Sequence, residues 1–505
     1  MKFFNTAGPI RVEEHYNLSP LARINIDEIL LLIKQKKYFV LHAPRQTGKT
    51  SSLFALRDFL NNQGEYYCIY SNFEDGQAYR NDIEKSSEVI IDRLLNEIRF
   101  NHSALYKKEY EKMKSIGSLL EEICVNADKP VVFIIDEIDS LIGDSLISVL
   151  RQIRSRYTNR PEFFPQSIIL CGVRDIRDYR ITTSKNEIIT GGSAFNIKAK
   201  SVTLGNFTID DIKNLYEQHT KETGQKFNQD IYDYVWELTE GQPWLVNALA
   251  YSACFEIEKD SNKTITKEII TLAKEQMIID RVTHLDQLSD KLKEERVRRV
   301  IEAILTGDET SEKILTDDID YVIDLGLIKK REGTLDISNQ IYREVIPRAL
   351  TYAQQLLLTQ EQKWYVENGK LNMEKMIKSF QEFWRENSEI WVEKFDYKEA
   401  APQLILQAFL QRILNGGGRI HREYGLGKKR TDLLIEFNNE KFVIEIKIKR
   451  GPKYKEEGIK QTLEYLDKCD SDKGYLIIFD VSKNKNWNEK IYSEKFNNKL
   501  TIYGM

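Results

Sequence analysis

The chain has 505 residues, of which 41% are hydrophobic and 30% charged, and this length predicts several domains rather than one core. Its 74 Lys and Arg nearly balance its 78 Asp and Glu, so any contact with a polyanion must be local. No apolar run approaches the roughly 20 residues of a membrane span, and the N-terminus lacks the pattern of a signal peptide. Five widely spaced cysteines without a C-x-x-C pair favour a reducing, cytoplasmic setting over disulfides or a zinc site.

The first predicted element that carries chemistry is the stretch LHAPRQTGKTSS at 41–52, between an apolar strand and a helical pattern. It nearly matches the phosphate-binding pattern G-x-x-x-x-G-K-[ST], with Ala43 at the first glycine, where a negative φ tolerates the added methyl. We expect Gly48 to admit a phosphate, Lys49 to reach the β- and γ-phosphates, and Thr50 to offer its hydroxyl to Mg²⁺. The expected nucleotide contacts are Ala43, Pro44, Gln46, Thr47, Gly48, Lys49, Thr50 and Ser51.

VVFIIDEIDS at 131–140 reads as a buried strand that ends in acids. In a parallel sheet these acids lie at the edge where ligands bind. Asp136 would hold Mg²⁺ through water and Glu137 would polarise the attacking water. The alternative is a buried strand that simply ends in surface acids. The loop and the acids together predict ATP binding.

Further strands are predicted at 66–74, 167–173 and 198–205, with helical patterns between them. This alternation predicts an α/β fold with a parallel sheet covered on both faces, in which 167–173 runs beside the loop strand. Arg174 follows that strand. It could sense the γ-phosphate, or it could pair with neighbouring acids.

LHAPRQTGKT, VVFIIDEIDS and GVRDIRDYR resemble the AAA+/STAND group of P-loop ATPases. The resemblance implies an ASCE/AAA+-like ATPase core at 1–206, a helical lid at 207–285 and a winged helix at 286–350. TEGQPWLVNALA resembles the lid helices of that group, which would bring Gly241 and Pro243 near the nucleotide. Tyr16 could stack on adenine or belong to the core.

Residues 317–350 read as a helix, two strands joined by a turn, and a helix, as in a winged helix. The strand pair carries Lys329, Lys330 and Arg331 beside Glu332, a weak basic patch that could contact DNA, although winged helices also dock proteins. Residues 351–395 are predicted to be a helical connector. Trp364, Trp384 and Trp391 in it favour packing over base stacking.

TDLLIEF and KFVIEIKIK, joined by a short turn, predict a β-hairpin near the C-terminus. Glu445 and Lys447 share one face of their strand, since side chains two apart point the same way, and Asp432 on the partner strand could converge on them. The two carboxylates and the Ile446 carbonyl are oxygen ligands suited to Mg²⁺ or Mn²⁺. A nearby lysine can assist a metal-bound water.

These residues resemble the signature of the PD-(D/E)XK nuclease superfamily, which implies an α/β restriction-endonuclease-like domain at 396–505. By the same resemblance Glu399 matches the acid of the first helix, and Gln461 and Tyr465 match a Q-x-x-x-Y motif. The basic residues of 447–455 would suit a phosphate backbone. The bland alternative is an accidental D–E-x-K pattern on a solvated face.

Two functions follow from these patterns. In the first, ATP regulates a metal-dependent nuclease acting on DNA, with RNA not excluded, in a setting such as bacterial genome defence or mobile-element biology. In the second, a STAND-type ATP switch carries a non-catalytic C-terminal module that binds DNA or protein. A homo-oligomer is left open, and no membrane contact is expected.

Overall fold

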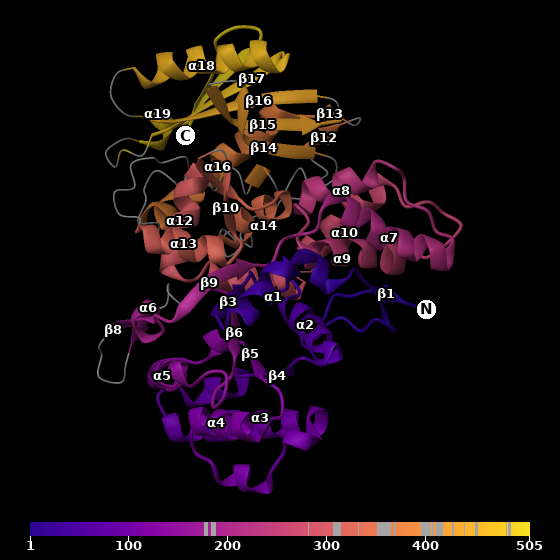
Figure 1. Ribbon diagram of the computed structural model, residues 1–505. Helices are drawn as coiled ribbons and strands as arrows, with labels where there is room; N and C mark the ends of the chain where they lie inside the picture. The colour runs from indigo at the N-terminus through magenta and orange to yellow at the C-terminus, as the bar shows by residue number, and fades with distance from the viewer. Residues whose placement is uncertain are drawn as a thin grey trace. The chain divides into compact units, whose positions relative to one another are not determined.

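The computed structural model describes residues 1–175, 180–182, 188–280, 282–306, 315–331, 333–350, 365–367, 370–394, 406, 409–410, 418–426, 429–438, 440–449, 453–480, 482 and 486–505. They divide into two units. The first comprises Met1–Asp286 and Ile314–Tyr342, and the second comprises Gln287–Lys313 and Arg343–Met505. Figure 1 labels the elements of both.

The first unit is built on a five-stranded parallel sheet in the order β4-β5-β6-β3-β9. Its strands are β3 (Tyr38–His42), β4 (Tyr67–Asn72), β5 (Val131–Asp136), β6 (Ser167–Gly172) and β9 (Lys198–Thr203). Each lies within a predicted strand, and β6 runs beside the loop strand β3 as expected. Of the three inner strands, β5 and β6 are buried along their whole length, because a parallel sheet is covered on both faces.

Helices cover both faces of this sheet. One core packs alternate strand residues against α3 (Ile83–Asn101), α4 (Ile116–Asn126) and α5 (Asp144–Ser155). The other packs the remaining strand residues against α1 (Ile26–Lys34) and α2 (Lys49–Gln63). Side chains that accept a backbone N–H begin several of these helices, as Asn25 does for α1 and Asp82 for α3. The α/β fold class is therefore confirmed for this unit.

Short elements connect these layers. Near the N-terminus are β1 (Phe3–Phe4), β2 (His15–Tyr16) and η1 (Pro20–Arg23). Between the main strands are η2 (Glu74–Tyr79), η3 (Ser103–Leu105), η4 (Lys108–Lys112), η5 (Ile138–Ser140), η6 (Tyr157–Asn159), β7 (Arg180–Thr182), β8 (Ile188–Thr190) and α6 (Gly191–Ala194). Tyr16 is buried against Phe4 and His219, so it belongs to the core and not to an exposed stacking surface.

Helices follow the sheet where the lid is predicted. They are α7 (Ile209–Thr223), α8 (Ile231–Thr239), α9 (Pro243–Tyr251), the π-helix η8 (Ser252–Ile257), α10 (Lys267–Ile279) and α11 (Thr283–Lys291). A capping box between Thr208 and Asp211 begins α7. Gly241 has φ +71°, and an added Cβ would lie 1.9 Å from the Phe207 carbonyl oxygen. The start of α9 therefore approaches the segment between β9 and α7 more closely than any other residue type would permit.

The predicted helix–strand–strand–helix order of 317–350 is confirmed. It consists of α13 (Thr316–Asp324), the antiparallel pair β10 (Ile328–Arg331) and β11 (Thr334–Ile337), and α14 (Gln340–Leu350). α12 (Glu295–Thr306) precedes it in the chain. The basic strand is partly neutralised, because Lys329 and Arg331 both pair with Glu240.

The second unit is built on a mixed six-stranded sheet in the order β14-β15-β16-β17-β19-β18. Its strands are β14 (Gly418–Leu426), β15 (Lys429–Phe437), β16 (Glu440–Ile448), β17 (Lys473–Phe479), β18 (Tyr492–Lys495) and β19 (Leu500–Gly504). The predicted hairpin is confirmed, with β15 antiparallel to β16 from Leu433↔Ile444 to Phe437↔Glu440. The strand β14, which the sequence reading did not assign, extends it on the other side.

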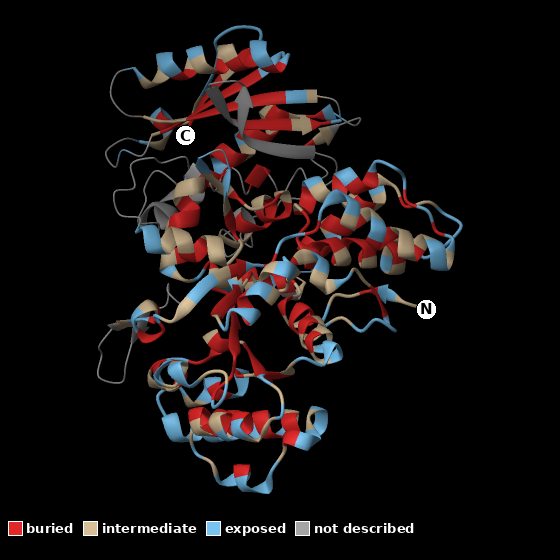
Figure 2. Ribbon diagram, viewed as in Figure 1, coloured by how far each residue is buried: buried red, intermediate tan, exposed pale blue. Residues whose placement is uncertain are grey.

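Both faces of this sheet are covered as well. α18 (Tyr454–Cys469) packs on one face with small clusters that include Leu434, Val443 and Leu466. The other face packs on α16 (Met373–Lys394) and on Leu406, Phe409 and Leu410. The remaining elements are the hairpin β12 (Val366–Glu367) and β13 (Lys370–Leu371), and α19 (Trp487–Lys490). The central strands β3, β5 and β6 of the first sheet and β16 and β17 of the second appear mostly as buried in Figure 2.

The predicted helical connector at 351–395 contains a helix that packs in the core of the C-terminal sheet. Met376, Phe380 and Trp384 of α16 are buried in the core of the C-terminal sheet. Their spacing fits one helical face that packs on a sheet. α16 is thus a structural layer of the C-terminal unit, and the packing role expected for Trp384 is confirmed. Trp364 and the side chain of Trp391 lie outside the described residues.

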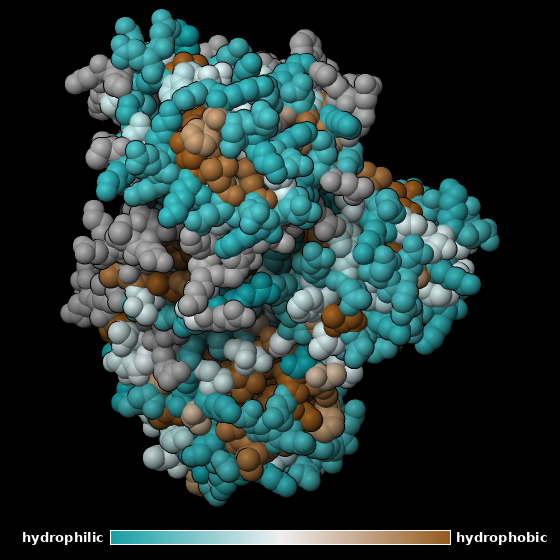
Figure 3. Space-filling model, turned by 90° about the horizontal axis from the view of Figure 1, so that it is seen from above, coloured by the Kyte–Doolittle hydropathy of each residue, from teal (hydrophilic) through white to brown (hydrophobic). Residues whose placement is uncertain are grey.

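On the surface shown in Figure 3 hydrophilic residues predominate, and hydrophobic residues form separate small areas. In the described part of the chain no helix combines the length and hydropathy needed to cross a bilayer. All five cysteines are buried as free thiols.

Candidate functional site

The phosphate-loop sequence forms the turn from β3 into α2. Gly48 has φ +86°, a left-handed conformation that favours glycine, and directly precedes the first residue of α2. Ala43 is buried and is not among the residues with positive φ, so the missing first glycine leaves the turn intact. The helix N-terminus and its positive dipole end therefore lie at the loop, as an anion site requires.

Lys49 and Thr50 take positions suited to a bound triphosphate. The Lys49 Nζ lies 3.0 Å from the Ala43 carbonyl oxygen and 3.1 Å from that of Pro44, so it folds back over the loop. The Thr50 hydroxyl donates to Oδ2 of Asp136 over 2.9 Å. Hydroxyl and carboxylate oxygens are ligands that Mg²⁺ prefers. The residues present thus fit a magnesium ion between α2 and β5.

Asp136 is fully buried at the end of β5. Besides Thr50, its carboxylate accepts the Tyr70 hydroxyl at 2.9 Å and the Glu137 amide at 3.0 Å. These donors fix its orientation, and a buried carboxylate held this way is suited to a metal or a charged ligand. The loop and the acids, far apart in sequence, are therefore brought together as the sequence predicted.

Glu137 has φ +54°, an uncommon conformation for a residue with a side chain. Burial raises the pKa of its carboxyl, and the charge of nearby Asp139 raises it further. Asp139 itself accepts the amide of Val173 at 3.0 Å and so connects the end of β5 to the end of β6. A carboxyl with a raised pKa beside a phosphate loop is a candidate general base.

The N-terminal segment and Arg23 hold the loop from outside. The Ile10 amide donates to the Ser51 hydroxyl at 3.0 Å. Arg23 donates to the Thr47 carbonyl at 2.6 Å and to the Gly205 carbonyl at 2.9 Å. Its guanidinium thus ties the loop to the end of β9, a role that the sequence reading missed because the three residues are distant in the chain.

The lid helices also reach the loop, through residues that carried no sequence signal. Gln242 caps α9, and its Nε2 donates to the Gln46 carbonyl at 3.4 Å. His284 contacts the Gln46 side chain through Nδ1 and the Tyr342 hydroxyl through Nε2, the latter at 2.6 Å. The His284 ring stacks on Trp244, with centroids 4.9 Å apart. Pro243 is the first residue of α9, next to the Gln242 that touches the loop.

Arg174, which follows β6, lies beside an acidic residue of α13. Its Nε lies 3.4 Å from Oδ2 of Asp324 in α13, and its guanidinium lies over the Tyr321 ring at 4.7 Å. Both side chains of the ion pair are largely buried. Arg174 thus pairs with an acid that is distant in the chain, whereas the sequence predicted pairing with neighbouring acids, and γ-phosphate sensing stays a prediction.

In the C-terminal unit, Glu445 and Lys447 lie on the face of β16 that α18 covers. They alternate with Ile444 and Ile446, which are buried in the core on the opposite face. Glu445 is buried, and Lys447 Nζ donates to its Oε1 at 2.9 Å. An added Cβ at Gly458 of α18 would lie 3.2 Å from Lys447 Cγ, so this helix packs closely over the pair.

Other residues of the expected metal set are only partly described. Asp432 belongs to β15, but its side chain lies outside the described part of the structure, as does all of Glu399. Among the side chains that are described, no group of three or more His, Cys, Asp or Glu could hold a metal ion. Gln461 and Tyr465 lie on α18, and Tyr465 is buried against the sheet.

Two lysines of the basic stretch 447–455 form ion pairs with acids of other segments. Lys449 pairs with Asp480 at 2.9 Å, and Lys455 pairs with Glu494 at 2.7 Å. The Lys449 amine and the Ser482 hydroxyl and amide hold the pKa of Asp480 below its usual range despite burial. These acids reduce the positive charge available to a phosphate backbone.

Comparisons with known proteins agree with the first unit and leave the second without an assigned activity. A domain of unknown function (DUF8371) matches residues 366–483. No curated protein matches the chain. The walker-type ATPase PABY2304 of Pyrococcus abyssi is 15% identical with a TM-score of 0.47, covering 68% of this chain and 99% of its own. Cdc6p of Pyrobaculum aerophilum is 15% identical with a TM-score of 0.35, covering 66% of this chain and 93% of its own.

The RuvB Holliday junction branch migration motor of Thermotoga maritima is 12% identical with a TM-score of 0.31, covering 64% of this chain and 95% of its own. The family described as AAA-like domain matches residues 23–347, more than half of the 505 residues. That span contains the phosphate loop, the acids after β5, the lid helices and the β10–β11 pair. The chain therefore belongs to the AAA-like domain family of ATPases.

Proposed function

We propose that this AAA-like ATPase binds and hydrolyses ATP at the loop between β3 and α2 and thereby regulates a metal-dependent nuclease in the C-terminal unit. The observation that carries the ATP site is the 2.9 Å hydrogen bond between Thr50 and Asp136. In this proposal Lys49 binds the β- and γ-phosphates, Thr50 and Asp136 hold Mg²⁺, and Glu137 activates water. The ion supplies charge neutralisation for the phosphates.

The nuclease half rests on the buried Glu445 and its contact with Lys447. A buried carboxylate needs a cation, a metal or hydrogen-bond donors to balance it, and Lys447 supplies one such group. If the register Leu433↔Ile444 continues by one residue, position 432 of β15 comes opposite Glu445. Asp432, Glu445 and the Ile446 carbonyl would then hold Mg²⁺ or Mn²⁺, with Glu399 as a further candidate and Gln461 and Tyr465 as supporting residues.

DNA is the candidate substrate, with RNA not excluded, because the residue types support phosphodiester hydrolysis assisted by a divalent metal, which acts on either nucleic acid. ATP would act by favouring one arrangement of the chain over another, since a ligand shifts a conformational equilibrium only through different affinities for its states.

The alternative is an ATP switch whose C-terminal unit binds DNA or protein without cutting it. The ion pairs Lys449–Asp480 and Lys455–Glu494 favour its protein-binding form, because they neutralise lysines that contact with a nucleic-acid backbone would use. In this alternative the Lys447–Glu445 contact is a structural pair.

Cleavage of plasmid DNA separates the two. Purified protein is incubated with Mg²⁺ or Mn²⁺, with and without ATP, as wild type, Lys447→Ala, Lys49→Ala and the exposed control Lys460→Ala. The nuclease proposal expects cleavage that Lys447→Ala abolishes, that Lys49→Ala uncouples from ATP, and that Lys460→Ala leaves unchanged. Cleavage by Lys447→Ala at the wild-type rate, or DNA retention without any cleavage, contradicts it.

A further inference from the structure

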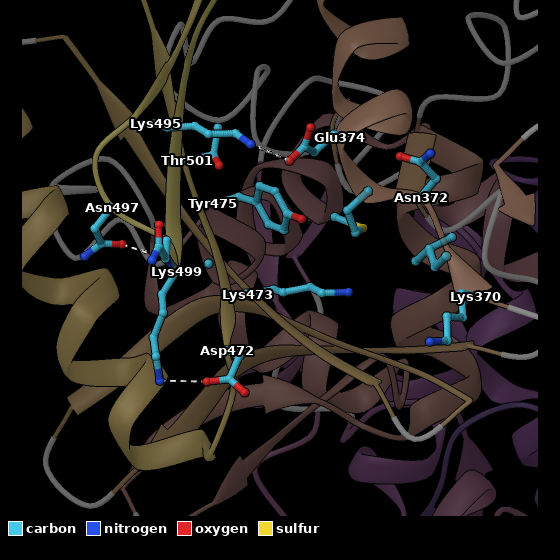
Figure 4. Close-up of a pocket in the computed structure, with 14 residues that line it drawn as sticks. Lys370, Asn372, Glu374, Asp472, Lys473, Tyr475, Lys495, Asn497, Lys499 and Thr501 are labelled. Atoms are coloured by element: carbon cyan, nitrogen blue, oxygen red, sulfur yellow. Dashed lines mark hydrogen bonds and ion pairs between the residues drawn. The ribbon is translucent and has the colours of Figure 1, made fainter.

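A pocket of about 820 Å³ lies in the C-terminal unit (Figure 4). It is lined by the start of β17, the start of α16 and the residues around the β18–β19 turn. Lys473 at the start of β17 is opposite Phe442 at the start of β16, whereas Lys447 is opposite Ile478 near the end of β17. The pocket is therefore at the other end of these strands from the proposed nuclease residues.

The lining is rich in positive charge. It includes the two carboxylates of Glu374 and Asp472 and the amines of four lysines, which are Lys370, Lys473, Lys495 and Lys499. Lys499 pairs with Asp472 at 2.6 Å, Lys473 pairs with Glu440 at 2.9 Å, and Lys495 lies 4.0 Å from Glu374. More than half of the surface of each of these lysine side chains is exposed, so these pairs are weak and can exchange for a ligand.

Tyr475 supplies a polar group at the base of the pocket. The residue is 5% exposed, and its ring lies among the lining side chains with the hydroxyl directed into the pocket (Figure 4). Among the hydrogen bonds of the described residues none uses this hydroxyl. Burial raises the pKa of Tyr475, and Glu374 raises it further, so the hydroxyl remains a donor at neutral pH. Because it opens on the pocket, this hydroxyl is available to a ligand or water that enters.

The N-terminus of α16 also faces this space. The helix is 22 residues long and begins at Met373, which lines the pocket together with Asn372 and Glu374. Asn372 caps it by accepting the amide of Lys375 at 3.1 Å, which leaves earlier amides of the first turn for another acceptor. The positive end of the helix dipole favours an anion there.

We propose that this pocket binds a small ligand that carries a phosphate group, of the size of a nucleotide. Lysines, a tyrosine hydroxyl and helix amides converge on it as donors, and Glu374 and Asp472 offer acceptors for hydroxyl or amino groups. Its volume falls within the range of about 300 to 1,000 Å³ common for small-molecule sites. These donors surround one pocket and do not follow an extended stripe of the surface, which favours a small ligand over a nucleic-acid backbone.

Calorimetric titration of the full chain tests this proposal. The protein carries Lys49→Ala and is kept free of divalent metal, so that neither the phosphate loop nor the nuclease residues contribute. The probes are inorganic pyrophosphate, 5′-AMP, 5′-GMP, 5′-CMP and 5′-UMP, with a short single-stranded oligonucleotide as the competing class. The variants are the double charge reversal Lys495→Glu with Lys499→Glu, the isosteric Tyr475→Phe, and the control Lys460→Glu on α18.

Saturable binding of pyrophosphate or a nucleoside monophosphate is expected. The double variant should weaken it at least tenfold and Tyr475→Phe by about tenfold, the effect of one hydrogen bond to a charged group, with Lys460→Glu unchanged. Tyr475→Phe leaves the packing intact, so its loss of binding does not reflect unfolding. No saturable binding, binding insensitive to both pocket variants, or binding of the oligonucleotide alone overturns the proposal. None of these results bears on DNA cleavage.

Discussion

The Nε of Arg174, at the end of β6, lies 3.4 Å from Oδ2 of Asp324 in α13, although 150 residues separate them in the chain. The two side chains are 10% and 14% exposed, so water screens the pair less than a surface pair. We expect Arg174→Ala and Asp324→Ala each to lower the free energy of unfolding. A double-mutant cycle measured by urea unfolding should give a coupling of about 1 to 2 kcal/mol.

Arg174→Ala and a second variant of its partner, Asp324→Asn, separate the two roles weighed for Arg174. Asp324→Asn removes the partner and keeps the guanidinium. If Arg174 only pairs with Asp324, both Arg174→Ala and Asp324→Asn destabilise the protein to a similar extent. A large loss of ATP hydrolysis in Arg174→Ala alone, with no change in stability, would show γ-phosphate sensing instead.

Glu137→Gln is expected to lower the rate of ATP hydrolysis by at least about 100-fold, the usual contribution of a general base, while ATP still binds. Lys49→Ala is its counterpart, because loss of the amine that reaches the phosphates should weaken ATP binding itself by at least about tenfold. Nucleotide binding and phosphate release are measured on both. Lys112→Ala, an exposed lysine of η4, is the control. Equal binding by Lys49→Ala and wild type would refute the proposed phosphate site.

His284 makes stability depend on pH. Burial lowers the pKa of His284 from 6.5 to about 4, so between these values the unfolded chain binds a proton that the folded chain does not. Stability from this group is present above pH 6.5 and is lost as the pH falls toward 4. At about pH 5 the loss should be about 2 kcal/mol. Urea unfolding at neutral pH and at about pH 5 checks this, and His284→Asn should show a correspondingly smaller decrease.

Gly241 and Gly224 form a matched pair for testing how closely the start of α9 approaches Phe207. Both have positive φ, +71° and +82°, but an added Cβ meets the Phe207 carbonyl oxygen at 1.9 Å in the first case and nothing within 4 Å in the second. Gly224→Ala should cost about 1 kcal/mol from backbone strain alone. Gly241→Ala should cost several kcal/mol more, because backbone must move. Thermal unfolding compares them, and similar decreases for the two variants would contradict the close approach.

The sequence alone determined the parts whose chemistry lies in consecutive residues. The strand–loop–helix at 38–63, the acids that end β5 and the hairpin of β15 and β16 follow from hydrophobic period, glycine and lysine at fixed spacing, and turn residues. These signals are local, since each depends on residues within a few positions of one another. They also gave the placement of Glu445 and Lys447 on one face, because alternation in a strand has a period of two.

Only the tertiary structure decided which distant residues meet. The contacts of Gln46 with His284, of Arg23 with Gly205 and of Arg174 with Asp324 join segments whose separation leaves no periodic or spacing signal. The pocket around Tyr475 likewise gathers lysines from separate elements, and α16 proved to be a core layer of the C-terminal unit because its apolar face finds a sheet to pack on. Such contacts depend on how strands are ordered and helices pack, which long-range burial decides and local sequence does not.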